Sequence, residues 1–178
     1  MKRIAAVCAL ALMSIASHAQ SGSREDAEEM SKYRDSGYKG GVSISQMLYG
    51  PLLCVGLETE HGIILNDSFF FGAGASANWF YMDIHAAVYS IFADFQIYTR
   101  FRESTPTIGF KAGYADFALL TKTYSPMFEP NVGWSWGIQR GMGINLNLGA
   151  QFFPAIDPDN GKKGTSLITP KLSVGIVF

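Results

Sequence analysis

The chain has 178 residues, a formal net charge of −1 at pH 7, and 16% charged and 13% aromatic residues. Soluble domains usually carry about 25% charged residues, so this composition predicts a surface that does not face water everywhere. A weakly acidic chain without a basic block is also a poor match to a nucleic-acid-binding protein, and we expect no nucleic acid among its partners.

Residues 1–19 have the three parts of a secretory signal peptide. A basic start is followed by an apolar run over residues 4–15 and by a small-x-small ending at Ala19. The run is too short to cross a bilayer as a helix, and no later stretch reaches the roughly 18 apolar residues that a helical span needs. We therefore expect cleavage after Ala19 and export. Cleavage removes Cys8, so Cys54 has no partner for a disulfide within the mature chain.

Two regions follow the signal peptide. Residues 20–37 are polar, mixed in charge and without periodicity, which is typical of a loosely ordered leader. Over residues 38–178 apolar and polar residues alternate, as they do in strands with two unlike faces. The alternation predicts eight strands of about ten residues, the length that a tilted strand needs to cross a bilayer; they cover residues 38–45, 52–62, 69–81, 87–100, 107–117, 129–140, 144–153 and 169–178.

An even number of strands can close into a barrel that has no free edge. The stretches 100–104 and 140–143 predict short turns, whereas 118–127 and 154–166 predict longer loops. Short turns at one rim, longer loops at the other and both termini on the short-turn side are typical of membrane barrels. The sequence thus predicts an all-β protein, an eight-stranded antiparallel up-and-down transmembrane β-barrel.

The composition of the two faces indicates which of them meets lipid. The non-apolar face is dominated by Gly, Ser and Asn, which suit the narrow interior of eight strands, so the apolar face is expected to form a lipid belt. Aromatic residues near strand ends are expected to form interfacial girdles; these are Tyr49, Trp79, Tyr81, Tyr98, Tyr124 and Trp134. A soluble lipocalin-like binding barrel, with the apolar face inward, is the alternative.

Four stretches carry a resemblance to a known family: "FFFGAGASANWFY", "SIFADFQIY", "TIGFKAGY" and the closing "KLSVGIVF". They resemble the small outer-membrane β-barrels of Gram-negative bacteria, of the OmpA/OmpX-like type, over residues 38–178. The resemblance implies an outer-membrane location, a periplasmic leader, contact with outer-membrane lipid and a monomer. It also implies that the barrel-assembly machinery reads the C-terminal strand, whose signal residues are Leu172, Val174, Ile176 and Phe178.

Charged residues also occur on the face that is predicted to line the lumen. By alternation, the inward-pointing charges are Lys39, Glu58, Glu60, Asp94, Lys111, Glu129 and Lys171. Because an isolated buried charge is costly, we expect these groups to pair. Two interpretations remain: a polar plug that keeps the barrel rigid and closed, and a gated ion path lined by the same groups.

The sequence offers little catalytic or metal-binding chemistry. His85 lies suitably for an outer-leaflet lipid-modifying enzyme, but Ala87 occupies the position where a nucleophilic serine would help. The stretch 157–161 places Asp157, Asp159 and Asn160 close together, but Lys162 follows at the position where a calcium loop needs glycine, so the stretch predicts a turn. Cys54 is expected to fill space in the lumen. We therefore predict no catalytic residue, no metal and no cofactor.

These observations predict a non-enzymatic outer-membrane protein with a structural or surface-interaction role and a closed polar lumen. The alternatives are a porin-like channel for small solutes, an outer-leaflet lipid-modifying enzyme and a soluble lipocalin-like barrel.

Overall fold

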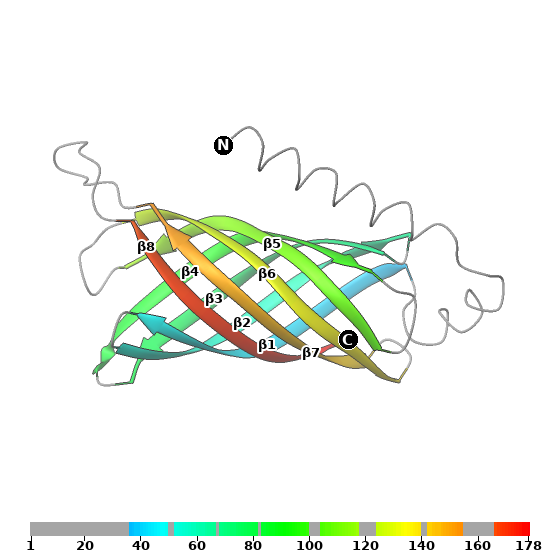
Figure 1. Cartoon of the computed structure of the whole chain (residues 1–178), viewed down its shortest axis with the longest axis horizontal. Helices are drawn as coiled ribbons and strands as arrows, with labels where there is room; N and C mark the ends of the chain where they lie inside the picture. The colour runs from blue at the N-terminus through cyan, green and yellow to red at the C-terminus, as the bar shows by residue number, and fades with distance from the viewer. Residues whose placement is uncertain are drawn as a thin grey trace.

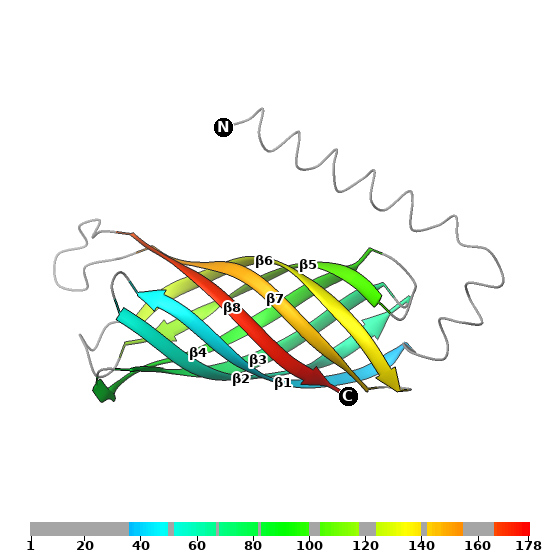
Figure 2. The ribbon, with the colours of Figure 1, turned by 60° about the horizontal axis from the view of Figure 1, so that its bottom comes forward.

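In the computed structural model, eight antiparallel strands close into a barrel (Figure 1). Each strand pairs with its neighbours along the chain, and the first pairs with the last. The tilt of the strands around the barrel is visible in a second view (Figure 2). The strands are β1 (Gly37–Tyr49), β2 (Leu52–Leu65), β3 (Phe69–Phe80), β4 (Asp83–Tyr98), β5 (Ser104–Asp116), β6 (Tyr124–Gln139), β7 (Met142–Phe153) and β8 (Leu167–Val177). The predicted fold class is confirmed.

The structure describes the strands and the residues that flank them. The described ranges are 36–49, 52–66, 68–81, 83–99, 104–117, 124–139, 142–154 and 166–178. The predicted signal peptide, residues 1–19, and residues 20–35 of the predicted leader lie outside these ranges. Within them, no helix is long and apolar enough to cross a membrane.

The seam between β1 and β8 closes the barrel. Val42 pairs with Ile176 and Ile44 pairs with Val174. The backbones of Gly40 and Phe178 exchange two hydrogen bonds, with N–O distances of 2.7 and 2.8 Å. Closure leaves no strand edge, which in lipid would expose unsatisfied backbone groups. The C-terminal residue therefore takes part in the closure itself.

The prediction of a loop over residues 118–127 is wrong for its last four residues. β6 begins at Tyr124, and Ser125 and Met127 already point into the barrel. Pro126 obscures the strand in the sequence, because proline lacks the N–H that a ladder uses and usually marks a break. The alternation of inward and outward side chains nevertheless continues through it.

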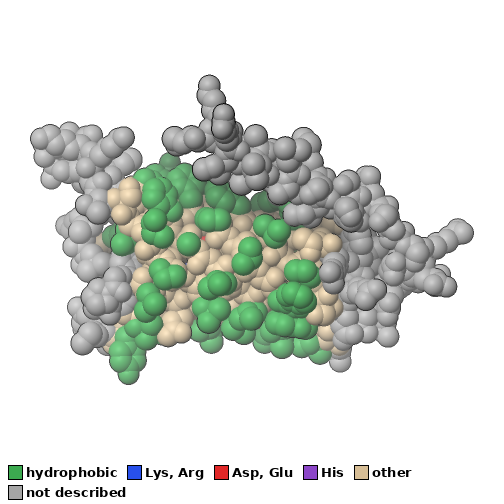
Figure 3. Space-filling view, in the orientation of Figure 1, with side chains coloured by type: hydrophobic (Ala, Val, Ile, Leu, Met, Phe, Trp, Pro, Cys, Tyr) green, Lys and Arg blue, Asp and Glu red, His purple; other side chains and the backbone are tan. Residues whose placement is uncertain are grey.

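Large hydrophobic side chains are exposed on the outer face of the described strands, and Figure 3 shows them on one side of the barrel, with backbone and other side chains between them. On β1 and β8 they include Ile44, Leu172 and Ile176, each 44 to 63% exposed. The side chains between them along each strand are buried inside, so the two faces differ as the alternation predicts. The predicted apolar outer belt is confirmed for the described strands.

One of the predicted girdle residues is placed wrongly by the sequence analysis. Tyr98 is only 1% exposed, and its hydroxyl accepts a hydrogen bond of 2.6 Å from Nζ of Lys39 inside the barrel. The reason is its place in β4, two and four residues after the inward-facing Gln96 and Asp94. The side chain of Tyr49 is not among those described, and the other four are exposed: Trp79, Tyr81, Tyr124 and Trp134.

The ring of Phe178 covers Gly40 on the outer face of the seam. A Cβ atom at Gly40 would lie 2.7 Å from Cε2 of Phe178 and 2.8 Å from the hydroxyl of Tyr38. Such distances are too short for real Cβ contacts. The ring of Phe178 therefore occupies space that is free only because Gly40 has no side chain. The ring in turn shields the bare backbone of the glycine from the surroundings.

We predict that Gly40→Val lowers the free energy of unfolding by about 1–3 kcal/mol, the usual cost of overpacking a filled site. The valine side chain would overlap the ring of Phe178, so the ring would have to move away. The measurement is urea-induced unfolding of the refolded protein in detergent micelles. Ala73→Val is the control, because Ala73 is exposed on the same face, away from the seam. Equal midpoints for the two variants would contradict the role of Gly40.

Candidate functional site

Six strands carry the seven predicted lumen charges to the interior of the barrel. Every one of them is buried, with at most 8% of the residue exposed. They come from β1, β2, β4, β5, β6 and β8: Lys39 on β1, Glu58 and Glu60 on β2, Asp94 on β4, Lys111 on β5, Glu129 on β6 and Lys171 on β8. The strand register brings these side chains, distant in the sequence, into one layer, which we call the charged layer.

Glu58 is the centre of the charged layer, because it binds two lysines at once. Nζ of Lys111 donates to Oε1 of Glu58, and Nζ of Lys171 donates to Oε2 at 2.5 Å. Lys171 also reaches Oε2 of Glu129 at 3.0 Å. Gln151 donates to the same Glu129 oxygen at 2.6 Å. These contacts tie β2, β5, β6, β7 and β8 together through the lumen.

A second group of contacts surrounds Lys39. Its Nζ lies 3.4 Å from Oε1 of Glu60 and 4.4 Å from the centroid of the Phe70 ring. Lys111 joins the two groups, since its Nζ is 3.6 Å from Oε2 of Glu60 and 3.9 Å from Oδ2 of Asp94. The charged layer is therefore one connected network.

The network contains four carboxyl groups and three ammonium groups among the described residues. Asp94 has the weakest ionic pairing, because its nearest ammonium partner lies 3.9 Å away. Its Oδ2 accepts a hydrogen bond of 2.7 Å from Gln96, while its Oδ1 is buried without a hydrogen-bond partner. Because a buried charge is costly unless it is paired, Asp94 is the member of the layer that gains least from being ionised.

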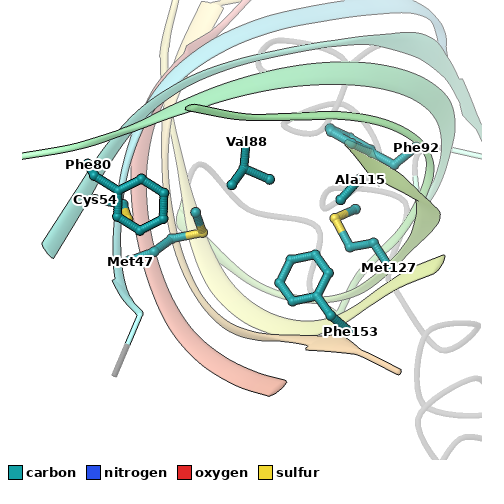
Figure 4. Packing of buried hydrophobic residues seen from close by; sticks show 8 residues of the cluster. All are labelled: Met47, Cys54, Phe80, Val88, Phe92, Ala115, Met127 and Phe153. Atoms are coloured by element: carbon teal, nitrogen blue, oxygen red, sulfur yellow. The ribbon is translucent and has the colours of Figure 1, made fainter. Parts of the chain in front are cut away.

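Apolar side chains fill the lumen beyond the charged layer, towards the rim that carries the β1–β2, β3–β4, β5–β6 and β7–β8 connections. These residues come from β1 to β7, and Figure 4 shows their side chains pointing inward. We call this cluster the apolar seal; it consists of Met47, Cys54, Phe80, Val88, Phe92, Ala115, Met127 and Phe153. A smaller cluster of Ile64, Phe70 and Tyr98 lies towards the other rim. The charged layer is thus enclosed between two apolar groups.

The apolar seal does not follow from the alternation of residues in the sequence. Gly, Ser, Asn and charged residues dominate the inward face that the sequence predicts. A signal was present, however, because the last inward positions of β1, β3 and β7 are the large residues Met47, Phe80 and Phe153. Cys54 lies buried within the seal, at 1% exposure.

The four predicted assembly residues lie on the outer face of the seam. Leu172, Val174, Ile176 and Phe178 are 44 to 56% exposed. β8 lies between β7 and β1, so that Val174 pairs with Leu146 on one side and Ile44 on the other. This is the position of the folded strand, and the reading of that strand by an assembly machinery stays a prediction.

The described residues contain no cluster of three or more His, Cys, Asp or Glu side chains that could hold a metal ion. His61 is exposed on the outer face, where its Nδ1 lies 2.6 Å from the hydroxyl of Tyr38 and its Nε2 lies 3.0 Å from Oγ1 of Thr59. The side chain of His85 and residues 157–161 lie outside the described part of the chain. The charged layer is the site that the structure assembles.

Two solved structures share this architecture. One is Neisserial surface protein A, with a TM-score of 0.59, 13% identity, and coverage of 80% of this chain and 95% of that one. The other is the N-terminal β-barrel domain of Pseudomonas aeruginosa OprF, with a TM-score of 0.51, 12% identity, and coverage of 81% and 100%. This chain has the fold of the small eight-stranded outer-membrane β-barrels. No family model matches the sequence, and no curated protein matches it either.

The contacts of the charged layer predict different effects on stability for substitutions of Glu58 and Asp94. Glu58→Gln should lower the free energy of unfolding by about 3 kcal/mol or more, because it leaves two buried ammonium groups short of their shared partner. Asp94→Asn should cost less than about 1 kcal/mol, since it removes the surplus acid and an amide oxygen can still accept from Gln96. Urea unfolding in detergent micelles measures both. A loss for Asp94→Asn as large as that for Glu58→Gln would contradict this assignment.

Proposed function

We propose that the protein is a non-enzymatic β-barrel of the outer membrane with a structural or surface-interaction role and a closed lumen. The observation that carries the proposal is the distribution of polarity, which is inverted relative to a soluble protein. Side chains such as Ile91 and Tyr114 are more than 60% exposed on the outside, while Glu58 and Lys171 are at most 2% exposed inside. A soluble lipocalin-like barrel would have the opposite distribution.

The proposed location rests on three features that agree. The N-terminal sequence has the pattern of an export signal, the strands have the length that crosses a bilayer, and the fold is that of known outer-membrane barrels. A barrel with an apolar belt is stable where lipid, or detergent in its place, covers the belt. Outer-membrane lipid is therefore the proposed environment, with the protein as a monomer.

The proposed assembly signal is the outward series of β8, which ends at Phe178. In cells, the barrel-assembly machinery would recognise this strand before it pairs with β1. Deletion of Phe178 is expected to lower the fraction of the protein that is inserted in the outer membrane of cells. The fraction that refolds in detergent should fall less, because no assembly machinery takes part there. If the folded fraction falls equally in cells and in detergent, Phe178 contributes only through its packing on Gly40.

The proposal of a closed lumen rests on the side chains that fill the interior of the barrel. Eight strands enclose little more than their own side chains. Here the connected charged layer occupies the middle, and the apolar seal occupies the lumen towards one rim. An ion crossing this path would have to separate paired charges and also pass an apolar group, and both steps are costly. The charged layer thus acts as a plug that joins the strands.

The second candidate function, a pore for small solutes, is favoured only by the presence of charges inside the barrel. We predict no discrete conductance steps when the purified protein is inserted into planar lipid bilayers. Removing side chains of the seal, as in Met127→Ala with Phe153→Ala, should also give no steps, because the charged layer still fills the lumen. Reproducible steps from the native protein whose size changes in Lys171→Gln would contradict a closed lumen; steps insensitive to that substitution would come from a contaminant.

A further inference from the structure

A groove crosses the outer face of the barrel from β1 to β6. Its volume of about 570 Å³ lies within the range of about 300–1,000 Å³ that is typical of small-molecule sites. Ala75 and Ala77 on β3 form its floor, because their side chains are small. Larger neighbours form the walls: Ala77 pairs with Leu57 on β2 and with Tyr89 on β4, and Ala75 pairs with Ile91 on β4.

The groove is apolar along its length and acidic at one end. Asp116, the last residue of β5, pairs with Tyr89 on one side and Tyr124 on the other, and Tyr114 also lines this end. Among the side chains that the structure describes, Asp116 is the only carboxylate on the outer face. A carboxylate at this end of the strand costs the barrel little, because the destabilisation by charge on the lipid-facing surface is large at the bilayer midplane and small near the interfaces. It gives an otherwise apolar groove one charged group that a ligand could contact.

The direction of the groove matches that of a membrane lipid. Asp116 lies at the rim of the β5–β6 connection, away from the C-terminus of the chain (Figure 1). The other end of the groove reaches Val42, in the middle of β1. A polar head would therefore lie at the membrane surface, and its apolar tail would point towards the middle of the bilayer.

The charge and the aromatic rings indicate which head group fits. A carboxylate attracts a cation, and the faces of tyrosine rings attract ammonium groups. An anionic head group alone would be repelled by Asp116. We propose that this groove binds one amphiphile that has an ammonium head group and an acyl tail, an inference that rests on the proposed membrane location. The ammonium group would lie between Asp116 and the rings of Tyr114 and Tyr124, and the tail would lie over Ala75 and Ala77.

Native mass spectrometry of the detergent-solubilised protein tests the proposal. The probes are lysophosphatidylethanolamine and lysophosphatidylglycerol with the same acyl chain, which differ in the ammonium group. We expect a single bound lipid and a preference for the ethanolamine lipid of about threefold or more, the size expected of one exposed ion pair. Asp116→Asn should abolish the preference and leave tail binding. Ala77→Leu should abolish binding of both lipids by filling the groove.

The control is Ala150→Leu, which enlarges an outward alanine on β7 that does not line the groove; it should bind both lipids as the native protein does. Equal retention of both lipids by the native protein would overturn the ammonium assignment. Equal lipid binding by Ala77→Leu and the native protein would overturn the site.

A native dimer that dissociates in the Ala77→Leu variant would instead show that a second copy of the chain occupies the groove. Strand content by circular dichroism and the need for detergent, measured on the same samples, separate these outcomes from failure of the proposed barrel itself.

Discussion

Closure of the backbone ladder is the constraint on which the rest of this structure depends. A strand in lipid has no water to satisfy its N–H and C=O groups, so the sheet must end where it began. Pairing of β1 with β8, extended to the backbone of Phe178, meets that requirement. Closure with eight strands then fixes a narrow interior. The sequence must fill that interior with side chains that need no water, and it must place lipid-compatible side chains outside.

The interior meets this demand by layering. Ion pairs in a confined space are stable only when each charge has close partners, and Glu58 has two lysines while Lys171 has two carboxylates. The apolar seal lies between this layer and one rim, and buried ion pairs interact more strongly than exposed ones because the local dielectric is low. The same contacts connect strands that are not neighbours in the sheet, so the lumen adds rigidity to a wall that is held mainly by its ladder.

Much of the fold could be predicted from the sequence, because one local rule generates it. Alternation with a period of two marks each strand, separates its faces and places Glu58 and Lys171 inside without any knowledge of partners. The predictions fail where residue type suggests something other than the alternation does. Pro126 concealed the start of β6, and the ring of Tyr98 was assigned by residue type although its position in β4 turns it inward.

Features that depend on register across several strands could not be predicted in the same way. The pairing of Lys111 with Glu58 joins residues on strands that are not adjacent, and alternation gives the face but not the height along the barrel. The groove over Ala75 and Ala77 likewise exists only because the register places larger side chains of β2 and β4 on both sides. Shear and tilt decide such neighbours, and no single strand encodes them.

In the proposed arrangement the apolar face meets lipid, while the polar face is enclosed within a closed barrel. Electrophoresis of the outer-membrane fraction in dodecyl sulfate, with boiled and unboiled samples compared, tests it most directly. A closed barrel resists the detergent until it is heated, so the unboiled protein should be found in that fraction and should migrate faster than the boiled protein. Recovery in the soluble fraction with the same mobility before and after boiling would contradict the account.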